Sequence, residues 1–254
     1  YIKNYGPGSL STISLRGASA SQTLVEWKGM ALNNPLSGQI DLSLIPNFLV
    51  DHYRLSSDAQ SGAIGGTVIL DQKATRLKTN RLILGGGSFG KQFAAAEINS
   101  VQDRHHLSTR LYHQRSNNNF DFKNNALVNR PEQVQRNANF EQLGGQFEFG
   151  LPLGVYQLKT GIWIQEYKRN LPSIMSYEGA GRDEKQIDKD FRGYISIDRY
   201  GRKAKLHQQF NLSALNNEYL LKQRLNSGWA TILNSKSRVQ QYQYIARYEF
   251  KGDA

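Results

Sequence analysis

The feature that most constrains this chain is a long alternation of apolar and polar residues that begins at about Thr79. Successive side chains of an extended strand point to opposite faces, so each alternating stretch predicts a strand with one apolar and one polar face. The clearest stretches are Leu143–Leu151, Val155–Tyr167, Leu206–Ala214 and Val239–Phe250. The fold class that this period of two predicts is all-β.

The connections between the stretches distinguish two kinds of β protein. Short links at Pro152–Gly154 and Gly201–Lys203 alternate with long links of 22, 23 and 22 residues at Asn117–Ala138, Lys168–Asp190 and Asn216–Ser237. Structureless connections beyond about 12–15 residues are uncommon in compact soluble domains. Outer-membrane barrels combine short turns at one end with long loops at the other, and strands of about ten residues suit a tilted crossing of a bilayer. The alternation therefore predicts a transmembrane antiparallel β-barrel.

The number of strands predicts a division of the chain. About eight strands fit between Arg81 and Phe250, and a closed barrel of about eight strands is filled by its own side chains, whereas plugged transporters have about 22. The residues before the first strand cannot fit inside so narrow a barrel. We therefore expect residues 1–73 to form an N-terminal plug domain and residues 79–254 to form the first part of a larger wall. A start at Tyr1 also predicts a processed or incomplete chain.

Composition excludes several classes of protein. With 39% hydrophobic residues and a mean hydropathy of −0.58, the chain lacks the roughly 18-residue apolar run that a membrane-spanning helix needs. Cysteine is absent, so there is no disulfide, thiolate metal site or cysteine nucleophile. The net charge is +11, but the basic residues are scattered along the chain. We expect no nucleic-acid partner, and anionic lipid head groups suit this charge equally well.

The first part of the chain reads as a compact β-rich unit. Two alternating runs, Thr12–Leu15 and Thr23–Met30, flank a small polar segment, and a third apolar run follows at Ile40–Ile45. Gly17 and Gly29 predict tight turns, because glycine adopts left-handed backbone without a steric penalty.

This unit resembles the plug of TonB-dependent outer-membrane receptors, especially the cobalamin-receptor-like branch. The order Leu-Arg-Gly, Leu-Val-x-x-x-Gly and Ile-Pro carries the resemblance, and Ser61–Gly66 resembles the strand that closes the family's plug. Lys28 departs from the family, which usually has an acidic residue before this glycine. The resemblance implies that Arg16 holds the plug through charge-assisted bonds to acidic groups. The residues to which it assigns a structural role in the plug are Arg16, Gly17, Gly29, Pro46, Gly65 and Gly66.

One glycine-rich segment, Gly85–Lys91, imitates a nucleotide-binding loop. It contains G-x-G-x-x-G, but a phosphate loop requires Ser or Thr after its lysine, where this chain has Gln92. A dinucleotide site also requires a βαβ unit, and no alternating helices are indicated downstream. We therefore expect this segment to form the first hairpin of the barrel, where glycine permits bending.

No catalytic or metal-binding constellation stands out in the sequence. His105 and His113 share a strand face, yet their spacing of eight residues separates them by roughly 26 Å, too far to bind one ion. The carboxylates at Asp183–Asp190 are interleaved with lysines and predict a solvated loop. Because no nucleophile elbow or Ser-His-Asp order is present, we expect no enzyme, no metal site and no cofactor.

Candidate ligand-binding residues come from three polar loops, where amide, carboxylate and aromatic groups together suit a polar ligand with an apolar face. The resemblance places ligand-facing apex loops of the plug at Asn33, Asn34, Ser37 and Gln39. The segment after Asn117 resembles the start of the family's second extracellular loop and contributes Asn119, Phe120 and Asp121. A third loop contributes Tyr177.

The resemblance implies a function in the bacterial outer membrane: TonB-dependent transport of a large scarce nutrient, a cobalamin-like corrinoid or an iron chelate, through a plugged barrel. The implied partners are outer-membrane lipid, a TonB-type periplasmic energy-coupling protein, the nutrient ligand, and a lipoprotein or other outer-membrane subunits. The alternative is a plug–barrel subunit with a structural or assembly role in a larger outer-membrane complex. A third hypothesis from the residues alone is a soluble β-sandwich that binds carbohydrate through exposed Tyr and Trp.

Overall fold

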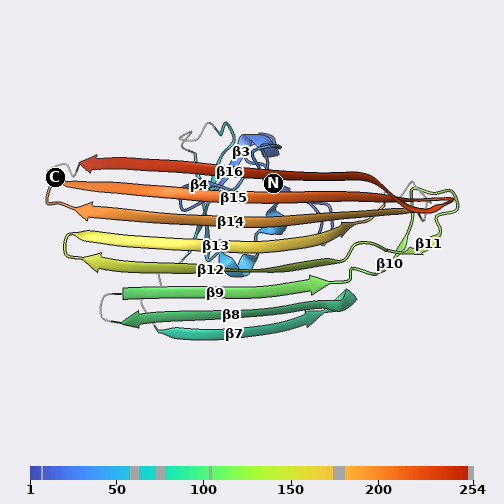
Figure 1. The fold of residues 1–254 in the computed structure, drawn as a ribbon, viewed down its shortest axis with the longest axis horizontal. Helices are drawn as coiled ribbons and strands as arrows, with labels where there is room; N and C mark the ends of the chain where they lie inside the picture. The colour runs from blue at the N-terminus through green and yellow to red at the C-terminus, as the bar shows by residue number, and fades with distance from the viewer. Residues whose placement is uncertain (7, 58–62, 73–77, 103–104, 174–180, 251–254) are drawn as a thin grey trace.

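The structure, a computed structural model, describes residues 1–6, 8–57, 63–72, 78–102, 105–173 and 181–250. The chain forms a small N-terminal domain and a long sheet, and the domain lies against one face of the sheet (Figure 1). Every helix among the described residues is a single 3₁₀ turn, and none is long and apolar enough to cross a membrane.

The N-terminal domain is built on a four-stranded mixed sheet in the order β4-β3-β6-β5, in which β3 and β6 run parallel. Its strands are β3 Thr23–Trp27, β4 Met30–Ala31, β5 His52–Ser56 and β6 Gly66–Asp71. A separate pair consists of β1 Ile2–Asn4 and β2 Ser11–Ile13. The domain is completed by three 3₁₀ turns: η1 Ala20–Gln22, η2 Leu42–Leu44 and η3 Asn47–Leu49.

A two-residue turn at Lys28 and Gly29 joins β3 to β4. Both residues have left-handed backbone, with φ of 50° and 76°, which is the geometry of a type I′ hairpin turn. The tight turn expected at Gly29 is therefore present, and Gly17 has the same φ of 76°. Gly65 lies in a crowded place, because a Cβ there would approach the Cβ of Ala18 to 2.7 Å. The next residue, Gly66, opens β6 with a φ of 113°.

The second part of the chain is an eight-stranded antiparallel sheet in the order β16-β15-β14-β13-β12-β9-β8-β7 (Figure 1). Its strands are β7 Thr79–Gly87, β8 Lys91–Gln102, β9 His105–Ser116, β12 Phe140–Leu153, β13 Tyr156–Leu171, β14 Arg182–Tyr200, β15 Ala204–Leu225 and β16 Gly228–Phe250. A small hairpin of β10 Asp121–Lys123 and β11 Glu132–Val134 separates β9 from β12 along the chain, and η4 Ser88–Gly90 lies between β7 and β8. The predicted number of about eight wall strands is confirmed.

Two of the three long loops predicted from the sequence are wrong. β15 and β16 stay paired through the whole of Asn216–Ser237 and turn only between Leu225 and Gly228. Most of Lys168–Asp190 likewise belongs to β13 and β14, whose register continues to Leu171. Both faces of these strand ends carry polar residues, so the hydrogen-bonded strands there show little apolar–polar alternation. The third segment, between β9 and β12, contains only the β10–β11 hairpin.

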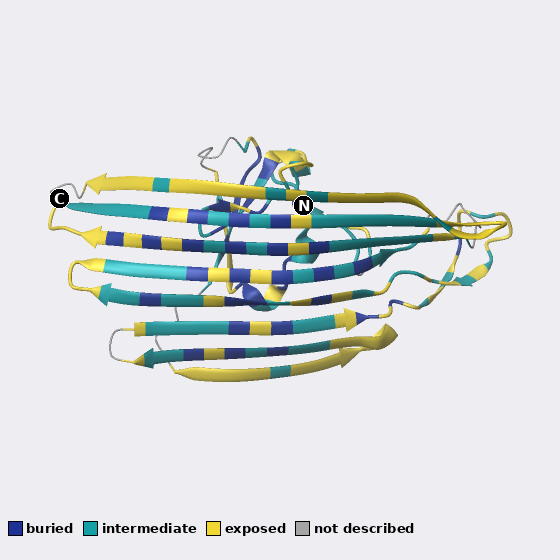
Figure 2. Cartoon of the chain, viewed as in Figure 1, coloured by how far each residue is buried: buried dark blue, intermediate teal, exposed yellow. Residues whose placement is uncertain are grey.

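Buried and more exposed residues alternate along the strands of the sheet (Figure 2), so its two faces differ as the sequence predicts. One face, here called the outer face, exposes large apolar side chains: Leu82, Leu84, Ile98, Leu111, Leu143, Phe147, Ile162, Ile164, Ile195, Ile197, Phe210, Tyr242, Tyr244 and Tyr248. The inner face, toward the N-terminal domain, buries polar ones: Glu97, Asn99, Arg110, Gln142, Gln146, Gln165, Arg169, Asp188, Asp190, Arg192, Asp198, Gln209 and Asn211. A water-soluble sandwich buries its apolar faces, so this structure contradicts the soluble-sandwich hypothesis.

The apolar core belongs mainly to the N-terminal domain, where Val25, Trp27 and Leu70 are completely buried. Trp27 extends this core to the wall. Its ring packs edge-on against Trp163 of β13, with centroids 5.4 Å apart, and against Tyr194 of β14 at 5.7 Å. Edge-to-face aromatic contacts of this kind fix the orientation of the domain on the sheet.

Candidate functional site

Polar bonds join the N-terminal domain to the inner face of the wall. Asp51 Oδ2 lies 2.7 Å from Arg110 Nη2, and Lys28 Nζ lies 3.2 Å from Glu148 Oε2. Gln209 Nε2 donates a hydrogen bond of 2.6 Å to the carbonyl oxygen of Lys28. When such hydrogen bonds and ion pairs break, water replaces the lost partners, so the net change in free energy is small. The polar part of this interface can therefore become hydrated, as a purely apolar core cannot.

The loop between β4 and η2 is held in shape by Asn33. Its amide Nδ2 donates to the carbonyl oxygens of Thr23 and Gly38, each at 2.9 Å, and its Oδ1 accepts from the backbone N–H of Val25 at 2.9 Å. The polar atoms of Asn33 are thus used by the backbone of the domain. Its role in the structure is to brace the loop that carries the other three plug candidates, Asn34, Ser37 and Gln39.

Asp41 fixes the end of this loop and reaches the wall. Its Oδ1 accepts hydrogen bonds from the backbone N–H groups of Ser11 at 3.0 Å and Ser43 at 2.9 Å. Its Oδ2 lies 2.8 Å from Arg169 Nη1 on β13, and the two side chains are only 10% and 5% exposed. A charge pair therefore connects the loop directly to the inner face.

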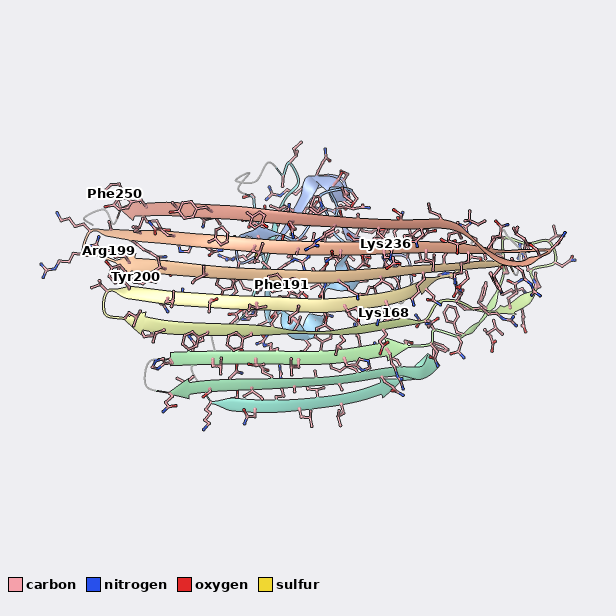
Figure 3. The ribbon with its side chains drawn as sticks, in the orientation of Figure 1. Lys168, Phe191, Arg199, Tyr200, Lys236 and Phe250 are labelled. Atoms are coloured by element: carbon pink, nitrogen blue, oxygen red, sulfur yellow. The ribbon has the colours of Figure 1, made fainter. Side chains whose placement is uncertain are left out.

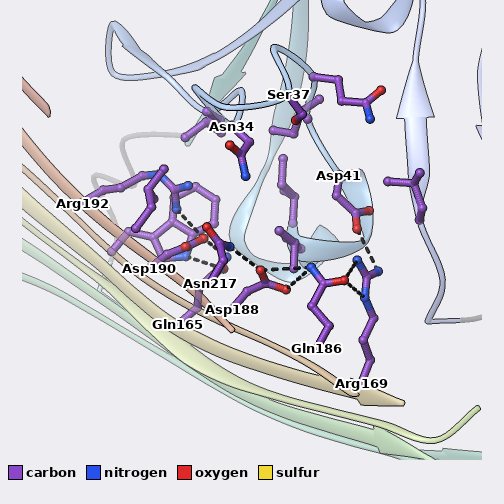
Figure 4. Close-up of a pocket in the computed structure, with 18 of the residues that line it drawn as sticks. Asn34, Ser37, Asp41, Gln165, Arg169, Gln186, Asp188, Asp190, Arg192 and Asn217 are labelled. Atoms are coloured by element: carbon purple, nitrogen blue, oxygen red, sulfur yellow. Dashed lines mark hydrogen bonds and ion pairs between the residues drawn. The ribbon is translucent and has the colours of Figure 1, made fainter. Parts of the chain in front are cut away.

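Arg169 begins a chain of hydrogen bonds across the strands β13, β14 and β15 (Figure 4). Its Nη2 donates to Gln186 Oε1 at 3.0 Å, and Gln186 Nε2 donates to Asp188 Oδ2 at 3.0 Å. Asn217 Nδ2 donates to Asp188 Oδ1 from the next strand. The carboxylate of Asp188, which is 2% exposed, is thereby held by two amides.

A second polar group lies beside this chain. Asp190 Oδ2 accepts from Gln165 Nε2 at 2.9 Å and from Arg192 Nη1 at 3.2 Å. The guanidinium of Arg192 lies over the ring of Trp163, 5.3 Å from its centroid. Its Nε is buried and has no hydrogen-bond partner in the part of the chain that the structure describes. A buried donor of this kind is free to bind a solute or a water molecule.

These groups line a cavity of about 370 Å³ between the plug loop and the wall (Figure 4). The loop contributes Asn34, Ser37, Gln39 and Asp41, and the wall contributes Gln165, Arg169, Gln186, Asp188, Asp190, Arg192 and Asn217. Three carboxylates face two guanidiniums, with several amides between them, so the cavity offers both donors and acceptors. Its volume lies in the range of pockets that hold small molecules, and we call it the plug–wall cavity.

The candidates from the outer loops do not line this cavity. Asn119 and Asp121 are exposed at the β10 hairpin. The ring of Phe120 packs between Phe89 at 5.4 Å and Phe122 at 6.2 Å. The structure thus places the plug candidates Asn34, Ser37 and Gln39 against the wall, but it does not place Asn119, Phe120 and Asp121 beside them. Tyr177 lies outside the described residues.

The acidic group predicted as a solvated loop is placed differently by the structure. Asp188 and Asp190 are buried on the inner face of β14 and belong to the plug–wall cavity. Sequence reasoning missed them because it placed them in a connection. The signal was present, since Gln186, Asp188, Asp190 and Arg192 occupy every second position and therefore share one face of a strand.

Among the predicted structural residues of the plug, Arg16 is the one whose expected contact is not formed. Its side chain is exposed, its φ is 52°, and no ion pair or hydrogen bond joins it to another described residue. Pro46 immediately precedes η3. The charge-assisted bonds between plug and wall are made instead by Lys28, Asp41 and Asp51.

The glycine-rich segment forms the expected hairpin. Gly85, Gly86 and Gly87 end β7, pair with the start of β8, and line a second cavity of about 660 Å³ beside Phe48 of the N-terminal domain. No helix follows the segment, as a phosphate loop would require. Within the described ranges, no group of three or more His, Cys, Asp or Glu side chains could hold a metal ion.

A small mixed sheet held against the polar inner face of a long antiparallel sheet defines a plug-and-barrel-wall fold. Among solved structures, the chain is similar to the copper transporter OprC, with a TM-score of 0.56 and 12% sequence identity. The match covers 98% of this chain and 48% of that protein, so the chain spans about half of its length. No family model matches the chain, and no curated protein sequence does.

The chain therefore shares the fold of part of OprC, a TonB-dependent outer-membrane receptor: a plug-like mixed sheet and eight strands that match part of that barrel. This confirms the predicted fold class and the predicted resemblance to a plug and part of a barrel wall. What the copper transporter carries is a property of that protein.

Proposed function

We propose that this chain forms the plug and part of the barrel wall of a TonB-dependent transporter in a bacterial outer membrane. The observation that carries the proposal is the wall itself, whose outer face is apolar and whose inner face is polar and holds the N-terminal domain. Strands of outer-membrane barrels alternate in this way between lipid and a polar interior. The similarity of fold to the copper transporter OprC supports the same class.

The apolar band on the outer face is close in height to the apolar band of outer-membrane barrels. On β13 it runs from Tyr156 to Ile164, a spacing that corresponds to about 27 Å along a strand. A tilt of 35–45° reduces this length to a height of about 20 Å, close to the roughly 25 Å band of outer-membrane barrels. Phe250 lies at the end of the sheet with the β12–β13 and β14–β15 turns (Figure 3), and the strand register places Tyr156 and Tyr248 at the same end, where interfacial aromatics are expected. We therefore orient the long β15–β16 hairpin outward from the cell.

The proposed solute is a polar organic or chelated nutrient, of which a corrinoid and an iron chelate are the two candidates. The mixture of carboxylates, guanidiniums and amides in the plug–wall cavity suits the hydrogen-bonding groups of such a solute, and the cavity of about 370 Å³ has room for part of it. The described residues offer no cluster suited to a bare metal ion. For this reason we do not extend the cargo of OprC to this chain.

The proposed partners are outer-membrane lipid around the wall and a TonB-type periplasmic protein that moves the plug. A lipoprotein or another outer-membrane subunit is the further proposed partner, in contact with the outward end of the long β15–β16 hairpin. Movement of the plug must break the ion pairs of Asp41, Asp51 and Lys28 with the wall. Because the wall side of each pair is hydrophilic, water can hydrate these groups when the interface opens. The same movement separates Trp27 from Trp163 and Tyr194 and so exposes their rings.

The test is uptake of a labelled corrinoid and a labelled iron chelate by cells that make the full-length protein, with and without the TonB-type partner. Arg169→Gln alters the cavity, and Lys168→Gln, its neighbour on the outer face, is the matched control. We expect Arg169→Gln to lower uptake about tenfold, since it removes a charge-assisted bond, and Lys168→Gln to leave uptake unchanged at equal protein levels.

Uptake that does not depend on the partner would contradict energy coupling. If both solutes stay outside while the protein copurifies in a stable outer-membrane complex, the structural or assembly role is supported instead.

A further inference from the structure

Two hollows adjoin each other on the outer face of the wall, away from the plug. The first, here called the charged groove, has a volume of about 270 Å³ and is lined by Ile187, Lys189, Asn216, Asn217, Glu218, Lys236, Ser237 and Arg238. The second, here called the apolar hollow, has a volume of about 750 Å³. Its outer-face side chains are Thr109, Leu111, Leu143, Phe147, Ile162, Ile164, Glu166, Lys189, Phe191 and Asn216. Lys189 and Asn216 line both, so the two hollows form one continuous surface.

An outward-facing glycine, Gly145, is among the residues that line the apolar hollow. Gly145 is paired with Leu111 on one side and Ile164 on the other. A Cβ at Gly145 would lie 2.6 Å from Leu111 Cδ2 and 2.7 Å from the carbonyl oxygen of Arg110. The glycine thus lets the side chain of Leu111 lie close against β12, and the apolar side chains of the neighbouring strands line the hollow around it.

The charged groove has an excess of positive charge. Lys189, Lys236 and Arg238 line it together with a single carboxylate, Glu218. Lys236 Nζ lies 3.0 Å from Glu218 Oε1, and Lys189 pairs with Glu166 beyond the groove at 3.1 Å. Arg238 forms no ion pair with another residue that the structure describes. The groove therefore attracts an anion.

The strand register places the charged groove next to the apolar hollow, as the charged head group of a lipid lies next to its acyl chains. Lys189, Asn216 and Arg238 lie opposite one another on β14, β15 and β16. The next outward position on β14 is Phe191, which belongs to the apolar hollow. Figure 3 shows Lys236 nearer to the long-hairpin end and Phe191 nearer to the middle of the sheet. Charge thus lies just beyond the apolar band, where head groups begin.

We propose that the charged groove and the apolar hollow together bind one phosphorylated lipid of the outer leaflet, with its phosphate against Lys189, Lys236 and Arg238 and an acyl chain in the hollow. The proposal rests on the proposed membrane placement of the wall, but not on transport. Cations at a membrane surface attract anionic head groups, and the hollow adds apolar contact that a soluble phosphate lacks. The site faces the bilayer and is separate from the plug–wall cavity on the inner face.

The test is equilibrium binding of phosphatidylglycerol with a fluorescent acyl chain to the full chain in micelles of neutral detergent. Arg238→Gln and Lys236→Gln should each weaken binding about fivefold. Arg199→Gln is the matched control, because Arg199 lies on the same face at the opposite end of the apolar band (Figure 3). Glu218→Gln should tighten binding, since it releases Lys236 and removes the only carboxylate of the groove.

A second pair of variants tests the hollow. Ile164→Trp fills the apolar hollow with the larger indole ring. Each methylene of the acyl chain that the ring excludes from the hollow should weaken lipid binding about fourfold. Ile195→Trp places the same side chain on the outer face outside the hollow and should leave binding unchanged. Equal affinities of Ile164→Trp and Ile195→Trp, or of Arg238→Gln and Arg199→Gln, would overturn the proposal.

Two further readouts separate the alternatives. If inorganic phosphate displaces the lipid at equal phosphate concentration, the acyl chain is not bound and the lipid site is rejected; displacement only at large excess supports it. If the protein stays monodisperse without detergent, the proposed membrane placement is wrong, and the lipid site is rejected with it. If the protein binds the lipid but transports no solute, only the proposed transport function is contradicted, and the lipid site is retained.

Discussion

The carboxylate of Asp41 lies 2.8 Å from the guanidinium of Arg169 and joins the plug loop to the inner face of β13. Both side chains are almost buried, and the backbone N–H groups of Ser11 and Ser43 hold the carboxylate from the plug side. Neither charge can turn to bulk water without moving the loop. The pair therefore ties the shape of the plug–wall cavity to the position of the plug.

Removal of the Asp41 charge should destabilise the protein strongly. Asp41→Asn leaves Arg169 buried without its ionic partner, and breaking a buried pair in this way costs about 3 kcal/mol. Asp71→Asn is the matched control, since Asp71 pairs with Arg54 at 3.0 Å while the two side chains are 38% and 65% exposed; an exposed pair contributes below about 1 kcal/mol. Urea unfolding in detergent, followed by tryptophan fluorescence, measures both. Equal midpoints for the two variants would contradict a buried pair.

A charge placed on the apolar band should be costly only where lipid surrounds it. Ile195 and Ile187 both point outward from β14, Ile195 within the apolar band and Ile187 beside Glu218 in the polar region. Arginine near the middle of a bilayer costs about 2–4 kcal/mol, falling to about 0–1 kcal/mol near the interface. We expect Ile195→Arg to reduce folding into lipid vesicles and Ile187→Arg to leave it nearly unchanged. A heat-modifiable shift on gels measures the folded fraction, and the reverse order of the two variants would reject the membrane placement.

The wall was predictable from the sequence wherever apolar and polar residues alternate, and not beyond. Val155–Tyr167 reads correctly because Ile162 and Ile164 point outward while Trp163 and Gln165 point to the plug. The alternation of apolar and polar residues fades toward the long-hairpin end of β14, β15 and β16, where polar residues occupy both faces. Apolar–polar alternation therefore does not separate these strand ends from loops, although the strands are paired there. A strand signal remains at this end of β14, in the set of polar residues at every second position from Gln186 to Arg192.

Of the candidate site, the sequence predicts the plug loop but not the wall residues that face it. The turn chemistry around Asn34, Ser37 and Gln39 marks a polar loop in the sequence, and the structure places that loop against the wall. The wall residues that face it, such as Arg169 and Asp188, come from strands far apart in the chain. Their meeting depends on strand register, which alternation alone does not specify when both faces are polar.

The turn at Gly29 offers a test of how tightly the plug contacts the wall. Gly29 and Gly17 both have a φ of 76°, so alanine at either position meets the same left-handed strain, about 1–2 kcal/mol. A Cβ at Gly29 would also lie 3.2 Å from Ile245 Cδ1 of β16, whereas nothing lies within 4 Å of one at Gly17. Gly29→Ala should therefore be less stable than Gly17→Ala in thermal melts of the detergent-solubilised protein. If Gly17→Ala is the less stable variant, the contact between this turn and β16 is absent.

The ion pair between Lys28 and Glu148 should be recoverable with its charges exchanged. Lys28 lies in the β3–β4 turn, and its Nζ is 3.2 Å from Glu148 Oε2 on β12, with side chains 23% and 15% exposed. Lys28→Glu places two carboxylates together, and Glu148→Lys places two ammonium groups together, so each single variant loses stability through repulsion. The double variant restores opposite charges across the same gap. We expect a coupling free energy of about 1–2 kcal/mol in a double-mutant cycle measured by urea unfolding. Additive losses in the double variant would mean that the two side chains do not interact and that the plug is held by its other contacts alone.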